Sequence, residues 1–291
     1  LVLYVWVDAP CEYIASTEEW ARERGEPDAW EDYWLDDDSS IVHVIGGDII
    51  QHHCVFWPAM LMGAEYSTPD AVMASGLVKV NDRAFSTSKG RAVWLDEDYL
   101  DEELNTDFIR YYITSYTGYE KDLNFSWELF RERVNNELVD TLGNFTYRSL
   151  LLAADHFDGV PGGPAGGALV GDGVSEDVLA EIEVATADFH AAIDDYDVKG
   201  AVEAAMALAG YGNEYIQQQE PWHLVDDDPE AAAQVLHDCV RIAKALAVLI
   251  EPVMPAAAED LWAQLDEPGS VHDATLDDCT APLSGGLGEP A

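Results

Sequence analysis

The chain has 291 residues, of which 48% are hydrophobic and 10% aromatic, enough for a sizeable core and for about two domains of ~100–150 residues. Its 14 Lys and Arg stand against 57 Asp and Glu, a formal net charge of −43, which excludes a generic basic nucleic-acid binder and a polybasic membrane-surface protein. Nine Trp, thirteen Tyr and eight Phe exclude an acidic disordered chain, because they supply the apolar surface that such chains lack.

An acidic, Lys-poor yet globular composition is typical of proteins that work in concentrated salt. At ~1 M salt the screening length falls to about 3 Å, so repulsion within such a chain is largely suppressed. We therefore interpret the charge as a surface adaptation rather than as an acidic functional site. The four Cys (Cys11, Cys54, Cys239 and Cys279) show no metal-ligand spacing, which favours isolated thiols in a reducing cytoplasm.

The first part of the chain alternates short β-branched runs with helical patterns, which predicts βαβ units on a parallel sheet. Strands are expected at 1–8, 41–45, 71–75 and 77–80, a helix at 48–62 and a mobile loop at 81–91. Because the sequence opens inside a strand-like run without an initiator Met, we expect it to be a piece of a longer protein.

From residue 108 onward the pattern is helical. Helices are expected at 108–116, 126–156, 175–194, 198–219, 229–250 and 255–265, with Ser175 as an N-cap. A Gly/Pro-rich interval at 159–173 predicts a linker, and a flexible tail is expected from Glu267. The predicted fold class is α/β followed by all-α: part of a Rossmann-type parallel sheet, then an antiparallel helical bundle.

The first chemical pattern is the apolar run that ends in Asp8-Ala9-Pro10. Ligands of open α/β sheets bind beyond the carboxyl ends of strands, so Trp6, Ala9, Pro10 and Tyr13 are placed to wall a small pocket. The alternative is a strand-end turn with ordinary core aromatics.

The second pattern is His43-Val-Ile-Gly-Gly-Asp48 and the predicted helix after it. Its glycines allow a close backbone approach to a ligand, and Asp48 is placed to accept from ribose hydroxyls. Ile49, His53 and Trp57 share one helix face, which is either part of a site or simply core. The adjacent His52 and His53 point to different faces, so no two-His metal site is expected.

Two further patterns involve phosphate and RNA chemistry. The hydroxyl-rich segment 79–91 carries nearby cations and suits contact with a triphosphate, although such loops are common. Asn144 and Arg148 lie one helical turn apart, and Trp222 follows Pro221 downstream. Trp and Arg side chains stack on unpaired RNA bases, but a core anchor and a solvated helix face explain these residues equally well.

Several of these segments also match one family in order along the chain. They are Tyr4-Val-Trp-Val-Asp-Ala-Pro10, His43-Val-Ile-Gly-Gly-Asp48, Phe56-Trp-Pro-Ala-Met60, Ser75-Gly-Leu-Val-Lys-Val-Asn81, Phe108-Ile-Arg-Tyr-Tyr112, Arg133-Val-Asn135 and Glu220-Pro-Trp222. In this set the sequence resembles the methionyl-tRNA synthetases, members of the class I aminoacyl-tRNA synthetases, over nearly the whole chain up to about Leu265. The acidic composition suggests the haloarchaeal type.

The resemblance implies specific roles. The methionine pocket would comprise Trp6, Ala9, Pro10, Tyr13, Ile49, His53 and Trp57. ATP, bound with Mg²⁺ as a substrate, would contact Gly46, Asp48, Val78 and Thr87. The segment Ala84–Ser88 matches the family's Lys-Met-Ser-Lys-Ser loop, so Ser86, Thr87, Ser88 and Lys89 are the candidate catalytic residues. Asn144, Arg148 and Trp222 match the positions that read the CAU anticodon of tRNA(Met).

The sequence also departs from the family pattern. Ala84 and Thr87 stand where the family has Lys, which makes Lys89 and Arg83 candidate substitutes, and Gly47 replaces a usual Lys near the nucleotide. The family's His-Ile-Gly-His-type motif and its Cys-rich zinc knuckle do not occur in these 291 residues. We therefore expect no zinc in this segment, and expect a C-terminal fragment that is inactive alone.

The resulting domain prediction is the second part of the catalytic domain at 1–122, an anticodon-binding bundle at 123–266 and the tail at 267–291. The predicted function is ATP-dependent methionine activation and transfer to tRNA(Met) in the cytoplasm. Two alternatives remain: a tRNA-binding module without catalysis, and a class I synthetase for another hydrophobic amino acid.

Overall fold

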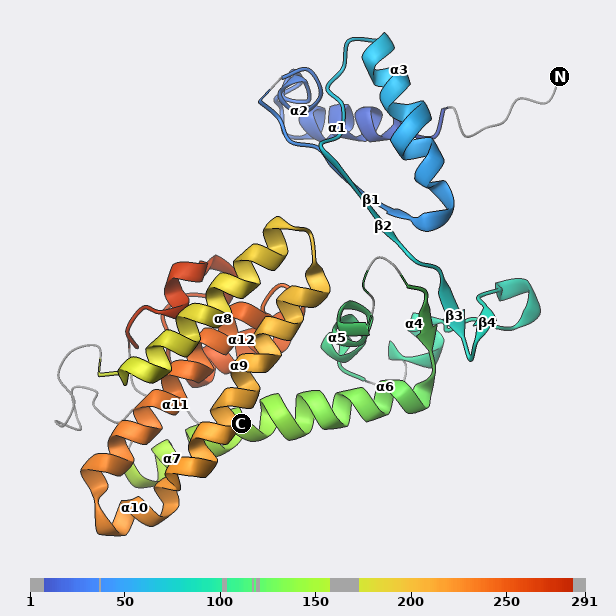
Figure 1. The fold of residues 1–291 in the computed structure, drawn as a ribbon. Helices are drawn as coiled ribbons and strands as arrows, with labels where there is room; N and C mark the ends of the chain where they lie inside the picture. The colour runs from blue at the N-terminus through green and yellow to red at the C-terminus, as the bar shows by residue number, and fades with distance from the viewer. Residues whose placement is uncertain are drawn as a thin grey trace. The chain divides into compact units, whose positions relative to one another are not determined.

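The computed structural model describes residues 8–36, 38–100, 104–116, 118, 121–157 and 173–284. The chain divides into two compact units, residues 1–78 with 119–123 (unit 1) and residues 79–118 with 124–291 (unit 2). Both are drawn in Figure 1. The predicted strand at 1–8 and the predicted linker at 159–173 lie, apart from Asp8 and Gly173, outside the described residues.

Unit 1 is a small α/β piece built on two parallel strands. Strands β1 (Val42–Gly46) and β2 (Ala71–Ser75) pair in register from Val42 opposite Ala71 to Gly46 opposite Ser75, so their carboxyl ends lie side by side. The helical segments are α1 (Cys11–Glu23), α2 (Glu31–Trp34), η2 (Gly47–Ile49), η3 (His52–Phe56) and α3 (Trp57–Gly63). The predicted strands at 41–45 and 71–75 are confirmed to within one residue.

The core of unit 1 is aromatic. Trp34, Trp57 and Leu61 are buried, and Ile14, Trp30, Ile41, Met60 and Tyr66 pack against them. The indoles of Trp34 and Trp57 meet edge to face with ring centres 6.2 Å apart, a favoured geometry for aromatic pairs. The Trp34 Nε1–H group donates to Thr17 Oγ1 at 3.0 Å, so its polar atom is satisfied inside the core.

The prediction of one α-helix at 48–62 is wrong, because the segment is built from three helix types. It begins as a 3₁₀ turn (η2), continues as a π-helical segment (η3) and becomes α-helical only from Trp57. The wider π turn reduces the angle between successive side chains. His53 and Trp57 nevertheless remain on the buried side, while Ile49 is half-buried.

Unit 2 begins with a tight hairpin. Strands β3 (Val78–Val80), β4 (Arg83–Ala84) and β5 (Leu123–Phe125) have the order β4-β3-β5, and the division between the units falls inside β3 and β5. Asn81 and Asp82 have φ values of 50° and 60°, as the two central residues of a type I′ turn require. The expected loop at 81–91 therefore contains β4 and a 3₁₀ turn, η4 (Thr87–Lys89).

The rest of unit 2 is helical. After α4 (Leu95–Asp98) and α5 (Thr106–Tyr116), a continuous rod comprises α6 (Trp127–Arg133), the π-helical η6 (Val134–Gly143) and α7 (Asn144–Phe157), which Figure 1 shows in green. A bundle follows, with α8 (Glu176–Asp194), α9 (Val198–Gln219), α10 (Pro221–Asp227), α11 (Pro229–Ile250) and α12 (Pro255–Gln264). Helix α11 packs against α7, α8, α9 and α12, so it is the central helix. In the described residues no helix is both long and apolar enough to span a membrane.

Two buried charged side chains of the bundle, Asp238 and Lys244, have close partners. Asp238 accepts hydrogen bonds from the Ser175 backbone N–H and hydroxyl and from the Tyr215 hydroxyl, at 2.6–2.8 Å. The Ser175 hydroxyl therefore donates to Asp238, and it does not cap its own helix by accepting from a backbone N–H group. Lys244 lies 3.1 Å from Glu267, and both side chains are only 2% exposed.

The C-terminal segment packs against α11. Residues 267–284, expected to form a flexible tail, contain η7 (Val271–Asp273) and η8 (Leu276–Cys279). The carbonyl of Thr280 accepts from Arg241 at 2.6 Å and that of Pro282 accepts from Lys244 at 2.8 Å. The segment is thus part of the helical unit, because its backbone satisfies cations that α11 buries.

Candidate functional site

Four aromatic and histidine side chains meet in unit 1. Tyr13 extends from α1, His43 from β1, His53 from η3 and Trp57 from α3. The Tyr13 ring lies 5.2 Å from His43, 6.0 Å from His53 and 6.3 Å from Trp57, measured between ring centres. His43 and His53 are themselves 5.5 Å apart. Three different segments of the chain therefore converge on one aromatic cluster.

Hydrogen bonds fix the rings of this cluster. The Ile49 carbonyl lies 3.2 Å from His53 Nδ1, so that nitrogen is the donor and Nε2 is left to accept from the Tyr13 hydroxyl at 3.0 Å. The Trp57 Nε1–H group donates to His43 Nε2 at 3.1 Å. Burial, and to a lesser extent the electrostatic effect of His53, lowers the pKa of His43, which favours the neutral acceptor form that this bond needs.

The cluster includes three of the seven residues expected around methionine. Tyr13, His53 and Trp57 lie together, and the Ile49 backbone holds His53. Ala9 and Pro10 precede α1, where their carbonyls accept from the first N–H groups of that helix. Trp6 lies outside the described residues.

His43 is a member of the cluster that the sequence did not single out. His43 and Ile45 lie on the buried face of β1, whereas Val44 between them is exposed on the other face. A histidine on the buried side of a strand needs a hydrogen-bond partner. That requirement is the sequence signal that could have predicted a contact between His43 and another polar group.

A cavity of about 290 Å³ lies beside Trp57. Its walls are Cys11, Ile14, Ala15, Glu18, Trp57, Met60, Leu61, Ala64 and Tyr66, all within unit 1. Mainly apolar walls with two aromatic rings, Trp57 and Tyr66, suit an unbranched apolar side chain, and a thioether gains further from contact with aromatic edges.

The carboxyl end of β1 shows why two glycines stand there. A Cβ atom at Gly46 would lie 2.8 Å from Asp48 Oδ1, and one at Gly47 would lie 3.1 Å from the Ser75 carbonyl oxygen. The turn therefore keeps Asp48 close to the strand end and exposed. Val78, the first residue of β3, is also exposed.

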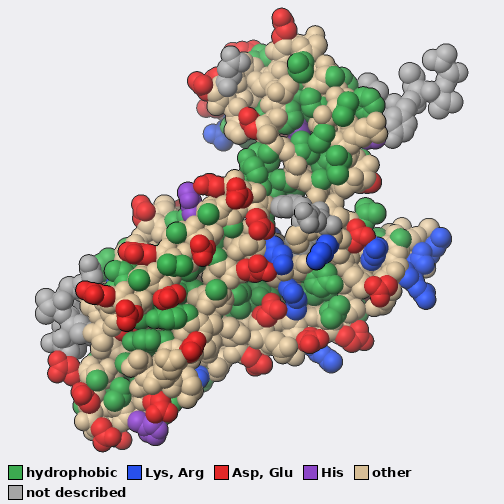
Figure 2. Space-filling view, in the orientation of Figure 1, with side chains coloured by type: hydrophobic (Ala, Val, Ile, Leu, Met, Phe, Trp, Pro, Cys, Tyr) green, Lys and Arg blue, Asp and Glu red, His purple; other side chains and the backbone are tan. Residues whose placement is uncertain are grey.

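The hairpin segment in unit 2 concentrates positive charge. Residues 79–91 hold Lys79, Arg83, Lys89 and Arg91, four of the 14 Lys and Arg of the chain, against one acid. Figure 2 shows Lys and Arg side chains gathered over the β3–β4 hairpin, whereas Asp and Glu are spread over the helices. In so acidic a protein, this local excess of positive charge favours the binding of an anion.

The turn of this segment is closed by backbone bonds. Ser86 and Arg91 exchange two hydrogen bonds at 2.7 and 3.0 Å, and the hydroxyls of Ser86 and Ser88 lie 3.3 Å apart. Thr87 and Lys89, in η4, are exposed. Arg91 was not among the expected site residues. The residue is half-buried, but its Nε is shielded from solvent and has no hydrogen-bond partner among the described residues.

A cation–π pair lies in the bundle. The Arg148 guanidinium carbon, on α7, lies 5.2 Å from the ring centre of Trp222 on α10. Asn144, one turn before Arg148, is exposed and donates to Asn213 Oδ1 at 3.4 Å. Two of the three residues expected to read an anticodon are therefore in contact, and the third shares the face of α7.

Comparisons with known proteins give one consistent result. A family model described as tRNA synthetases class I (M) matches residues 1–150, and a model of the anticodon binding domain of methionyl tRNA ligase matches residues 164–286. The methionine–tRNA ligases of Haloarcula marismortui and Halobacterium salinarum are each 50% identical over 100% of this chain. The chain spans only 42% and 41% of those proteins.

Solved structures agree. A crystal structure of Mycobacterium tuberculosis methionyl-tRNA synthetase bound by methionyl-adenylate matches with a TM-score of 0.81 and 27% identity. That match covers 99% of this chain and 55% of the solved one. The predicted fold class and the family resemblance are thereby confirmed.

Proposed function

The chain belongs to the class I tRNA synthetases of the methionine type, and we propose that it supplies the methionine pocket, part of the ATP site and the anticodon-reading helices of a methionine–tRNA ligase. Because it spans about 40% of its curated relatives, the activity is proposed for the complete protein. That protein would act in the cytoplasm, where tRNA is charged for translation.

The aromatic cluster of unit 1 carries this proposal. Tyr13 from α1 meets His53 and Trp57 from the continuous η3–α3 segment, and a mainly apolar cavity adjoins the Trp57 ring. The aromatic rings of the cluster present polarizable surface, which suits the sulfur of methionine better than a charged side chain. The resemblance assigns the same residues to methionine.

ATP would bind with Mg²⁺ through the residues that the resemblance assigns to it, Gly46, Asp48, Val78 and Thr87. Asp48 and Gly46 would hold the adenosine part, with Val78 beside it. In the activation step a methionine carboxylate oxygen forms a bond to the α-phosphorus, and the bond to pyrophosphate breaks. The hydroxyls of Ser86, Thr87 and Ser88 would bind the departing phosphates, and Lys89 would offset their charge in place of the family's loop lysines.

Arg91 is the natural partner of Lys89 in that role. Its Nε has no hydrogen-bond partner among the described residues, and its backbone is tied to Ser86. Since guanidinium groups bind phosphate bidentately, Arg91 supplies geometry as well as charge.

In the bundle, Trp222 and Arg148 would stack on bases of the CAU anticodon, with Asn144 bonding a base edge. Phosphate contacts lose affinity steeply with salt, whereas stacking is worth about 1–3 kcal/mol per base. An acidic protein in concentrated salt therefore depends on these planar groups for RNA binding.

Exposed apolar side chains support the view that unit 1 is completed by further protein. Val44 on β1 is 73% exposed and Met62 on α3 is 70% exposed. Val55 and Phe56 of η3 are also exposed. A two-stranded sheet with an exposed β-branched side chain is normally covered by another layer.

The direct test is reconstitution. The purified chain is mixed with a separately purified protein comprising the preceding half of a haloarchaeal relative, and methionine-dependent exchange of pyrophosphate into ATP is measured in concentrated KCl. We expect exchange with methionine only when both parts are present, and none from either part alone.

The two alternatives give different results. Anticodon-dependent tRNA binding without exchange in the mixture would indicate a binding module that has lost catalysis. Exchange supported by leucine or valine as well as by methionine would indicate a synthetase for another hydrophobic amino acid. Exchange by the chain alone would contradict the proposed division of the active site.

A further inference from the structure

A second cavity lies in unit 2. It has a volume of about 300 Å³ and lies where α5, the rod and α12 meet. Its larger apolar lining side chains are Phe108, Leu138, Leu142, Ile250, Met254 and Leu261. Leu138 and Leu142 belong to η6, a π-helical segment, and such segments are frequent at functional sites.

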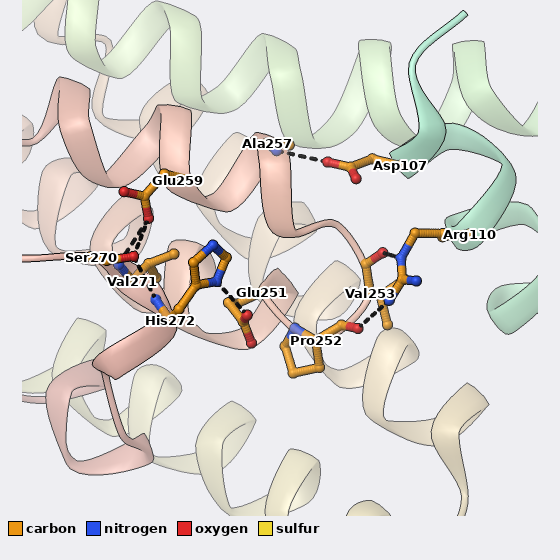
Figure 3. Close-up of polar contacts among 10 residues, drawn as sticks. All are labelled: Asp107, Arg110, Glu251, Pro252, Val253, Ala257, Glu259, Ser270, Val271 and His272. Atoms are coloured by element: carbon orange, nitrogen blue, oxygen red, sulfur yellow. Dashed lines mark hydrogen bonds and ion pairs between the residues drawn. The ribbon is translucent and has the colours of Figure 1, made fainter. Parts of the chain in front are cut away.

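One lining residue is a buried carboxylate. Asp107, at the start of α5, is 1% exposed, and its Oδ2 accepts from the Ala257 N–H at 2.7 Å, near the N-terminus of α12 (Figure 3). Its other oxygen, Oδ1, has no hydrogen-bond partner among the described residues. An unmet buried acceptor costs roughly 1–3 kcal/mol, and more when it is charged. Asp107 therefore has one oxygen in use and one available.

The charged side chains that line the cavity are all acidic. Asp260, on α12, is the second carboxylate of the lining, and none of the described lining residues is Lys, Arg or His. Two carboxylates beside mainly apolar walls match a molecule with one positive end and a hydrocarbon body. Oδ1 is shielded from solvent, so a ligand reaches it through a side-chain shift in the cavity wall, where Met254 is the most flexible apolar side chain.

We propose that this cavity binds a small organic ammonium ion, a protonated primary amine with a short alkyl chain. The ammonium group donates to Asp107 Oδ1 and the alkyl chain lies against Leu138, Leu142 and the other apolar walls. Asp260, which is exposed, adds long-range attraction at the rim. None of the residues proposed to bind methionine, ATP or tRNA lines this cavity.

The test compares two probes of the same shape on the 291-residue chain. Binding of n-butylammonium chloride and of uncharged n-butanol is followed by ligand-observed NMR at constant, high KCl. We expect saturable binding of butylammonium, at least tenfold tighter than that of butanol. This comparison uses the wild-type chain, so it does not depend on whether any variant folds.

Variants then locate the site. Asp107→Asn is expected to lower butylammonium affinity at least tenfold, and Asp260→Asn only two- to threefold. Asp188→Asn removes an exposed charge on α8 and is expected to leave the affinity unchanged. Equal affinities for the two probes, no saturable binding, or an equal loss in Asp107→Asn and Asp188→Asn would each overturn the proposal.

Discussion

Replacing Trp222 by Ala tests how an acidic protein binds a polyanion. The indole of Trp222 packs with the Arg148 guanidinium at 5.2 Å, so the substitution removes both a stacking platform and the partner that orients Arg148. Stacking on one base is worth about 1–3 kcal/mol, which corresponds to a loss of about 5- to 150-fold in affinity. Because stacking is not a charge interaction, we expect the loss to persist as salt is raised.

The assay is fluorescence anisotropy of a labelled anticodon stem-loop carrying CAU, titrated with the chain at several KCl concentrations. Lys199→Gln is the matched control, because Lys199 also lies on the bundle, at the start of α9, and pairs with Glu203 at 3.0 Å. We expect less than about a twofold change for this control in concentrated salt. Circular dichroism of both variants checks that the helices are retained.

Equal losses for Trp222→Ala and Lys199→Gln would refute the reasoning, since they would mean that charge rather than stacking determines RNA binding. The same conclusion would follow if the effect of Trp222→Ala disappeared when salt was raised. A loss that is equal for CAU and for an unrelated anticodon would show that the pair binds RNA without reading bases.

Three further predictions concern stability. Lys244→Met leaves the buried Glu267 without its cation and is expected to cost about 3–5 kcal/mol, part of which Glu267→Gln recovers in the double variant; urea midpoints measure both. Burial lowers the pKa of His43, so its stabilising contribution is fully present above about pH 6.5 and is lost as the pH falls towards the lowered folded-state value. His43→Gln keeps an acceptor for Trp57 and should flatten this dependence in Trp fluorescence, whereas an unchanged slope would contradict the assignment. Finally, the net charge of −43 predicts that the helical circular dichroism decreases on dialysis into salt-free buffer, and an unchanged spectrum would be evidence against a salt adaptation.

The sequence predicted the bundle helices best, because their ends carry strong local signals. The helices expected at 198–219 and 229–250 have these bounds in the structure. Asp197 and Asp228 cap them by accepting from the N–H groups of Gly200 and Ala231, and Pro229 opens α11. Caps and prolines act within one turn, so a sequence pattern is sufficient to find them.

What the sequence left out depends on contacts between distant segments. Helix α1 was not predicted, because Ala21 is its only fully buried residue and its apolar stripe is weak. Strands β4 and β5 have two and three residues, too few for an alternating pattern. In the aromatic cluster, His43 was overlooked because its role depends on Trp57, fourteen residues away. By contrast, the spacing of Ile49 and His53 placed both on one helix face, and the Ile49 carbonyl does lie 3.2 Å from His53 Nδ1.

The segment after α12 also determines where this protein can be shortened. Thr280 and Pro282 supply the carbonyls that hold Arg241 and Lys244, while Glu267 supplies the countercharge. A version ending at Leu265 would keep every long helix. It would lack the two carbonyls that accept from the buried Arg241 and Lys244, and also the carboxylate beside Lys244. Recombinant forms of the bundle should therefore extend at least to Ser284, whose N–H donates to Glu267 at 2.9 Å.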